Sequence, residues 1–391
     1  MPASRHVSSL RVLPLVLVLV LPGLARGQDI PAADHAAFDP LVAQVAASWD
    51  SARGGWVGRS GVPSTSAITL AFTFDDDSWR ARALETTEWM MATLRDTIGG
   101  GYLNSARDQE ASSGAMTKPT DANARRLEMF LMLERETGNP VFRREAARVA
   151  DYMDRVLLDG RGGFVSGQGG DRELVGDANG IAIHAWLDWA VVKNNRGIRD
   201  FALKSLDTVW ERCQTDGPLI RHGQFGELMK NAMLEDQVEM GRAFVFAHRL
   251  AGRARDRARA IALGDLVLAR YEINDNKKGR GGFYSHIAIN DKGVVKGDGR
   301  DADENARAVL FLADLSHLTG DAKYADAARR AVAAFAPKFD KLELDAADWA
   351  LAVRALTVDD TPQPPAWMAA TSAPKPAERP RSKRYRTLAG R

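Results

Sequence analysis

Acidic residues recur at the starts of four segments with the pattern of apolar helices. Asp121, Asp177 and Asp303 each open such a segment, and a fourth begins at Glu235 with Glu239 one turn later. Two carboxyl groups facing each other across a pocket can hydrolyse a glycosidic bond, one as the acid and the other as the base or nucleophile. Asp121, Asp177, Asp303 and Glu239 are therefore candidate catalytic residues. Helix capping alone would also explain each aspartate.

A histidine provides a different candidate acid–base group. His184 lies in the segment that Asp177 opens, and Asp188 follows one helical turn later, where it could orient the imidazole as a general base. A core histidine held by hydrogen bonds is the alternative. Sugar epimerisation would suit two histidines across a pocket, and His222 and His286, both in expected loops, are the plausible partners.

Aromatic, amide and arginine side chains accompany these acids. Aromatic faces beside carboxylates suit sugar rings, which present apolar C–H faces and hydroxyl groups. Arginines could bind a substrate carboxylate, although a salt bridge between hairpins would explain them equally well. We therefore expect a carbohydrate or glycan as the ligand. The predicted substrate-binding residues are Trp56, Tyr102, Asn123, Arg125, Asn179, Glu235, Tyr284, Asn305 and Arg307.

An internal repeat relates many of these residues. The segment TDANARRLEMFLMLERETGNP from Thr120 aligns with ADENARAVLFLADLSHLTGDA from Ala302 at an offset of 182 residues. This alignment superposes Asp121 on Asp303, Asn123 on Asn305 and Arg125 on Arg307. The DAN motif recurs at 177–179, and LEDQ at 234–237 occupies the corresponding place in the next unit. A repeated unit of this kind indicates one recurring supersecondary structure.

Each unit reads as a glycine-rich loop, an apolar helix, a tight turn and a second amphipathic helix. Apolar residues recur three and four positions apart, and Gly follows the first helix of most units. We expect first helices near 64–74, 121–136, 177–193, 235–250, 303–318 and 345–357, and second helices near 38–48, 78–95, 140–157, 198–212, 255–272 and 322–336. This pattern predicts an all-α (α/α)6 toroid of six helical hairpins over residues 28–359, with minor β-structure in the long loops. In a closed ring the last helix would pair with the first; the alternative is an open solenoid.

The helix-starting acids should then converge. The long loops lead into the N-termini of the inner helices, so the acidic motifs would meet at one mouth of the ring. The free amides of those N-termini favour anions there. We therefore expect the substrate pocket at the N-terminal ends of the inner helices.

Several motifs together resemble a known group of helical proteins. GGGY at 99–102, TGNPVFRREAARVADYM at 137–153 and GGF at 162–164 resemble the helical region of exported or thioredoxin-domain-containing spermatogenesis-associated-type proteins. These belong to the N-acylglucosamine 2-epimerase-like and six-hairpin glycosidase superfamily. The resemblance covers roughly residues 36–358 and implies the toroid. The thioredoxin domain is absent, and SSGAMTKPTDANA at 112–124 stands where the family tends to carry an H-F-E-K-like stretch.

The two ends of the chain differ from its body. Arginines precede a 14-residue apolar run from Val12 to Ala25, which is typical of a signal peptide over residues 1–27. An uncleaved anchor is the alternative. Residues 360–391 read as a disordered Pro-rich basic tail that could touch an anionic envelope surface or simply aid solubility. We expect an exported protein, periplasmic or secreted.

Composition excludes several functions. The single cysteine, Cys213, excludes an intramolecular disulfide and a cysteine-based zinc site, and the mildly acidic body argues against nucleic acid as a partner. GDGRDADE at 297–304 lacks the full calcium-loop pattern, so no metal and no cofactor are predicted. The sequence thus favours an exported glycoside hydrolase-like protein, or less readily a sugar epimerase. A non-catalytic toroid that binds a glycan or a partner protein is the alternative, and the oligomeric state is not predicted.

Overall fold

Twelve α-helices account for most of the described chain. The computed structural model describes residues 32–110, 118–168, 172–215, 217–223, 231–273, 281–290 and 293–359. The helices are α1 (Ala32–Ala47), α2 (Thr65–Ala71), α3 (Asp77–Thr93), α4 (Thr120–Thr137), α5 (Pro140–Tyr152), α6 (Gly176–Lys193), α7 (Arg196–Cys213), α8 (Leu234–Ala251), α9 (Ala254–Arg270), α10 (Ala302–Thr319), α11 (Ala322–Phe335) and α12 (Ala346–Ala355). All twelve predicted helices are confirmed, most of them within two residues at each end.

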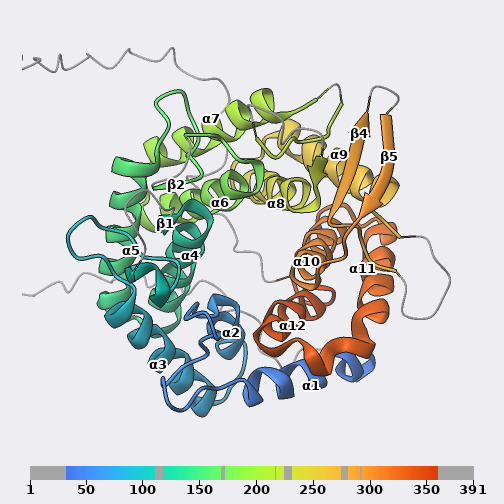
Figure 1. Ribbon diagram of the computed structural model, residues 1–391. Coiled ribbons are helices and arrows are strands. Elements are labelled where there is room, and N and C mark those ends of the chain that lie inside the picture. The colour runs from blue at the N-terminus through green and yellow to red at the C-terminus, as the bar shows by residue number, and fades with distance from the viewer. Residues whose placement is uncertain are drawn as a thin grey trace, which may run out of the picture.

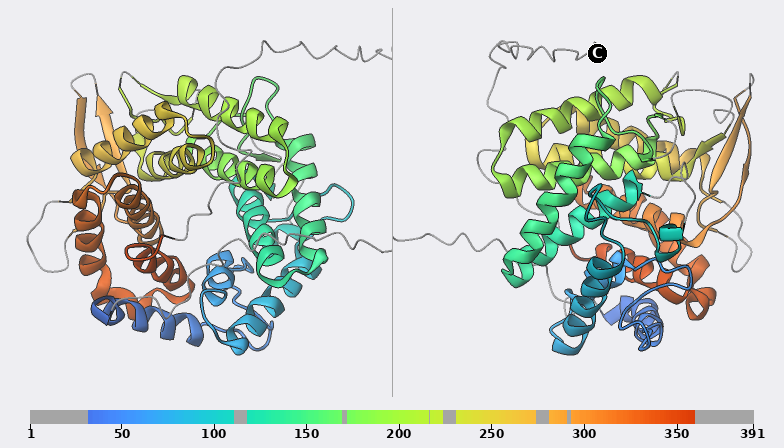
Figure 2. Two further views of the ribbon diagram at one scale, coloured as in Figure 1. Left: turned by 180° about the vertical axis from the view of Figure 1, so that it is seen from behind. Right: turned by 60° about the vertical axis from the view of Figure 1, so that its left-hand side comes forward.

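The helices form two concentric rings. The even-numbered helices surround the centre and the odd-numbered helices lie outside them, as Figures 1 and 2 show from the two faces of the ring. Each inner helix contacts the next, and α12 contacts both α2 and the outer helix α1. The predicted pairing of the last helix with the first is therefore confirmed. The structure is a closed (α/α)6 toroid, and the open solenoid is wrong.

Tight turns join each inner helix to the following outer helix. Gly138, Gly252 and Gly320 end α4, α8 and α10 with φ of 65°, 67° and 72°, in the left-handed region that glycine enters without strain. The next outer helix often begins on a side-chain cap, such as Asn139 for α5 and Asp321 for α11. These local signals explain why the helix boundaries could be predicted.

Short antiparallel strands lie in the long connections, as expected. β1 (Lys118–Pro119) pairs with β2 (Gly167–Gln168). β3 (Asn231–Met233), β4 (His286–Asn290) and β5 (Gly293–Asp298) form a second sheet in that order, with a register shift between Ala288 and Ile289. The sheets connect the outer helices to the N-termini of the inner ones, so they fix where each inner helix begins.

The apolar core lies between the two rings. It is made of buried Leu, Val, Ala and aromatic side chains from nearly all the helices. Glycines allow the closest approaches: a Cβ at Gly180 on α6 would lie 2.5 Å from the backbone carbonyl carbon of Glu239 on α8. Such contacts hold the inner helices at fixed positions around the centre.

The described helices are not membrane spans. None of them is long and apolar enough to cross a bilayer. The predicted signal peptide and basic tail lie outside the described residues and stay predictions.

Candidate active site in the central cavity

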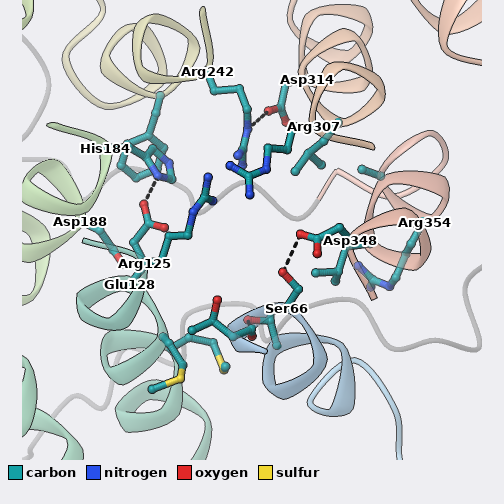
Figure 3. A pocket seen from close by; sticks show the side chains of 18 of the residues that line it. Ser66, Arg125, Glu128, His184, Asp188, Arg242, Arg307, Asp314, Asp348 and Arg354 are labelled. Carbon is teal, nitrogen blue, oxygen red and sulfur yellow. Dashed lines mark hydrogen bonds and ion pairs between the residues drawn. The ribbon is translucent and has the colours of Figure 1, made fainter. Parts of the chain in front are cut away.

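A cavity of about 330 Å³ occupies the centre of the ring, and side chains from all six inner helices line it. In α4, α6, α8 and α10 the lining begins at least one turn after the first helical residue and continues toward the C-terminal end. Figure 3 shows how the polar side chains point into this space. The polar lining comprises Thr65, Ser66, Thr69, Thr73, Arg125, Glu128, Arg135, His184, Asp188, Arg242, Arg249, Arg307, Asp314, Asp348, Arg354 and Asp359.

A cluster of ion pairs lies beside the cavity, toward the N-terminal ends of the inner helices. The Glu239 carboxylate accepts a hydrogen bond from Arg125 Nη2 at 3.0 Å, and Arg242 Nη1 and Arg307 Nη1 lie 3.5 Å from it. Burial alone would raise the pKa of Glu239, but the three guanidinium groups outweigh it and lower the pKa to about 2. Glu239 is therefore an ionised anchor, buried to 2% exposure, and does not line the cavity.

The other predicted acids also lie outside the cavity lining. Asp303 accepts a 2.7 Å hydrogen bond from Arg307 Nη2, and Glu235 lies 3.4 Å from Arg307 Nη1. Burial raises the pKa of Glu235 to about 8. Neither residue lines the cavity, nor do Asp121 and Asp177. The expected pocket at the inner-helix N-termini is therefore a different place from this cavity, and it stays a prediction because parts of the long loops before those helices lie outside the described residues.

The capping interpretation of the repeated aspartates is also wrong. Asp121, Asp177 and Asp303 are each the second residue of their helix, and the N-caps are Pro119, Val175 and Asp301. Only the last N-cap uses its side chain: Asp301 accepts hydrogen bonds from the amides of Asp303 and Glu304. Acids in the first turn still face the positive end of the helix dipole, which explains their recurrence.

The repeated amides attach the long loops to the inner helices. Asn123 accepts from the Tyr102 amide at 2.8 Å and donates to the Tyr102 and Pro119 carbonyls, both at 3.0 Å. Asn179 does the same with Phe164, and Asn305 with Phe283. All three asparagines are fully buried. The prediction that Asn123, Asn179 and Asn305 bind substrate is therefore wrong, because their buried side-chain amides form hydrogen bonds to the backbone.

The predicted aromatic rim is not present at the cavity. Trp56 is 0% exposed and donates its indole N–H to the Val45 carbonyl at 2.9 Å. Tyr102 is buried and its hydroxyl donates to Glu145 at 2.9 Å, while the half-buried Tyr284 does not line the cavity. Trp56 and Tyr102 belong to the core between the rings because that is where an aromatic following a loop glycine points in this fold.

His184 does line the cavity, but its partner differs from the expected one. Its Nδ1 forms a hydrogen bond with Glu128 on the neighbouring helix α4, and its ring contacts the Phe246 ring with centroids 4.1 Å apart. Asp188 instead accepts two hydrogen bonds from Arg135 Nη1, at 3.0 and 2.9 Å. The Glu128–His184 pair is an oriented acid–base group, with α4 rather than α6 supplying the carboxylate.

Asp348 is a cavity residue that sequence reasoning missed. It is the third residue of α12, accepts a 2.6 Å hydrogen bond from Ser66 Oγ on α2, and lines the cavity. Burial raises its pKa, and the charge of Asp303 adds to the effect. No DAN-type motif marks its helix, so only the closing of the ring brings it to the centre.

One group of side chains outside the cavity has the chemistry of a metal site. Asp177, His222 and Asp236 each offer a ligand atom, and these atoms lie within 4.8 Å of one another. The same groups also bond among themselves: His222 Nδ1 lies 3.3 Å from both Asp236 oxygens, and the Asp177 amide donates to Asp236. The hydrogen bond to Asp236 raises the pKa of His222 to about 9. At neutral pH the protonated imidazole therefore pairs with the Asp236 carboxylate.

The two-histidine arrangement expected for an epimerase is not formed by the proposed partners. His222 faces Asp236, and His286 lies in β4, away from the cavity lining. Among the described residues that line the cavity, His184 is the only histidine. Arg125, His184 and Arg307 are the predicted site residues that the structure does bring into the cavity wall.

Comparison with known proteins supports the fold. No protein-family model and no curated protein matches the sequence. Among solved structures, the chain is similar to a D-mannose isomerase (TM-score 0.61, 14% identity, covering 78% of this chain and 85% of that one). It is also similar to the cellobiose 2-epimerase of Bacillus thermoamylovorans (0.63, 11%, 76% and 86%) and to an unsaturated glucuronyl hydrolase specific for heparin (0.62, 12%, 83% and 96%). At this level of identity the similarity shows the shared (α/α)6 toroid fold. The likeness to the six-hairpin glycosidase superfamily and to its spermatogenesis-associated type stays a prediction.

Proposed function

We propose that this protein is an exported carbohydrate-active enzyme of the glycoside hydrolase type, with its active site in the central cavity. The observation that carries the proposal is the presence, in one central cavity, of a carboxyl group with a raised pKa and an oriented carboxylate–imidazole pair. The similarity to sugar-converting enzymes of the same fold supports a sugar as the substrate. The signal-like composition of residues 1–27 supports export.

The residues divide into two chemical roles. Asp348, whose pKa is raised by burial, is suited to donate a proton to the leaving glycosidic oxygen. Glu128 and His184 together are suited to take a proton from the attacking water. Ser66 holds Asp348 in place through the hydrogen bond that it donates to the carboxyl group. These assignments replace Asp121, Asp177, Asp303 and Glu239.

Epimerisation or isomerisation is the second candidate. It is favoured by the similarity to the mannose isomerase and the cellobiose 2-epimerase, whose TM-scores of 0.61 and 0.63 lie on either side of the 0.62 of the hydrolase. The same side chains would serve, with His184 removing a proton from a sugar carbon and Asp348 protonating an oxygen. The two chemistries differ in whether a glycosidic bond is broken.

The test is product analysis on a panel of oligosaccharides. We expect new reducing ends, and we expect Asp348→Asn and His184→Gln to lower kcat by about 10²- to 10⁴-fold. Asp326→Asn on α11, an exposed acid outside the cavity, is the matched control and should leave kcat unchanged.

Each other result has a defined meaning. A changed sugar with intact bonds would replace the hydrolase proposal with epimerisation. Binding without any conversion would leave a non-catalytic glycan-binding toroid. Full activity of Asp348→Asn would contradict the assigned acid.

A further inference from the structure

Three guanidinium groups converge on one end of the central cavity. Arg125 on α4, Arg242 on α8 and Arg307 on α10 point toward one another in Figure 3. Their side chains keep 22%, 22% and 19% of their surface exposed. Arg125 and Arg307 occupy the same place in their helices, since each is the sixth residue. The toroid repeat thus supplies two of the three from opposite parts of the ring.

The carboxylate that these arginines share lies behind them. Glu239 is 2% exposed and does not line the cavity. Asp303, the other carboxylate that pairs with Arg307, does not line the cavity either. The surface that faces the cavity at this end is therefore made of guanidinium N–H groups, with Asp314 at its side, 3.5 Å from Arg242 Nε.

Arg125 has more N–H donors than its contact with Glu239 uses. Within the described part of the chain its guanidinium makes a single hydrogen bond, through Nη2 to Glu239. A guanidinium has five N–H donors in a planar fork, a shape that matches a carboxylate with two parallel hydrogen bonds. A ligand carboxylate could accept from Arg125 without displacing Glu239.

Hydroxyl groups line another wall. Thr65, Ser66 and Thr69 of α2 face the same cavity. The Ser66 and Thr69 hydroxyls donate to Asp348 and to the Thr65 carbonyl, so their oxygens can accept from sugar hydroxyls, and this wall suits the neutral part of a sugar. The cavity thus offers one region for hydroxyl groups and one for an anion.

We infer that the cavity selects sugars that carry a carboxylate, such as uronic acids, and that this carboxylate binds Arg125 together with Arg242 and Arg307. The inference rests on the proposed function, because it places its substrate class in the same cavity. The low pKa of Glu239 supports it, since the same positive groups that keep Glu239 ionised act on any anion in front of them.

Calorimetric titration of the full chain tests the inference with four probes: D-glucuronate, its methyl ester, D-glucose and glucose 6-phosphate. We expect D-glucuronate to bind at least about tenfold more tightly than glucose or the ester, because hydrogen bonds to charged groups are strong ones. Arg125→Gln should abolish this preference while leaving glucose binding unchanged. The variant should fold, since Arg242 and Arg307 still pair with Glu239.

Two further variants complete the experiment. Arg330→Gln on the outer helix α11 makes the same change at a surface ion pair and should keep the full preference for glucuronate. Arg125→Lys keeps the charge but not the fork, so it should retain only part of the preference. A thermal transition recorded for each variant reports whether it is folded.

The outcomes separate this inference from the proposed function. Equal binding of glucose and glucuronate, or a preference that survives in folded Arg125→Gln, would overturn the inference and leave the carbohydrate proposal standing. Glucose 6-phosphate binding as tightly as glucuronate would overturn the carboxylate as the recognised group. If no sugar binds, the proposed function fails as well.

Discussion

The carboxylate of Glu239 is the centre of a buried cluster of charged side chains. Three arginines from three inner helices surround it, and they come from α4, α8 and α10, so the cluster joins helices that are not all neighbours in the ring. Removing the carboxylate itself would leave three buried arginines without their shared negative charge, which is strongly destabilising, whereas loss of one arginine still leaves Glu239 two partners. Glu239 is thus a structural residue at the end of the cavity rather than the catalytic base that its spacing from Glu235 suggested.

Substitution of Glu239 should be strongly destabilising. We expect Glu239→Gln to lower the free energy of unfolding by roughly 3–5 kcal/mol at pH 7, since three arginines would then repel one another. Urea denaturation measures this loss. Glu88→Gln on the exposed face of α3 is the control and should change stability by less than about 0.5 kcal/mol.

The same carboxylate gives a pH dependence of known sign. Its pKa is about 2 in the folded protein and 4.5 as the ordinary value. A lowered pKa stabilises the fold above pH 4.5, and this stabilisation is lost as the pH falls toward 2. The difference in unfolding free energy between the wild type and Glu239→Gln should therefore be smaller at pH 3 than at pH 7. An unchanged difference would mean that Glu239 is not held ionised by its partners.

At the scale of elements, the sequence predicts helix ends, which depend on neighbouring residues, better than it predicts contacts between distant residues. Gly138 and Asn139 end one helix and cap the next through their own backbone and side-chain chemistry, so the sequence around them suffices. Asn123 looks like a site residue in the sequence, because its backbone partners at Tyr102 are 21 residues away. Asp348 has no marking motif at all. Its role depends on Ser66, which lies 282 residues earlier.

Glycine at helix–helix contacts provides a prediction for an element. In an isolated helix Gly180→Ala would be favourable by about 1 kcal/mol. In α6 the new Cβ would lie 2.5 Å from the backbone of Glu239 on α8, where no side chain can move aside. We expect a net destabilisation of about 1–3 kcal/mol, measured by urea denaturation.

A helical glycine without such a neighbour is the comparison. A Cβ at Gly197 on α7 would approach only the Asn195 side chain, at 3.2 Å. Gly197→Ala should therefore leave stability within about 1 kcal/mol of the wild type. If Gly180→Ala were equally mild, the close approach of α6 and α8 would not be a constraint on the inner ring.

At the scale of the whole molecule, closure of the ring creates the cavity. The lining comes from six helices between Thr65 and Asp359, so no contiguous segment contains the site. The repeat predicts the toroid because each hairpin follows local rules. It does not predict that long side chains such as Arg125 and Arg307 meet Glu239 across the centre, because these residues lie on different helices.

Closure also predicts how the chain responds to truncation. In an open solenoid a terminal unit contacts only one neighbour and its loss is tolerated. Here α12 contacts α1, α2 and α10, and Trp349 is fully buried against Phe335 and Phe339, with ring centroids 4.8 and 5.4 Å apart. Removing residues 346–391 should therefore abolish the single cooperative thermal transition, followed by circular dichroism. Removing only residues 360–391 leaves the twelve described helices in place and should preserve the transition. A shorter chain that still unfolds cooperatively near the wild-type temperature would show that the ring does not need its last helix to be stable.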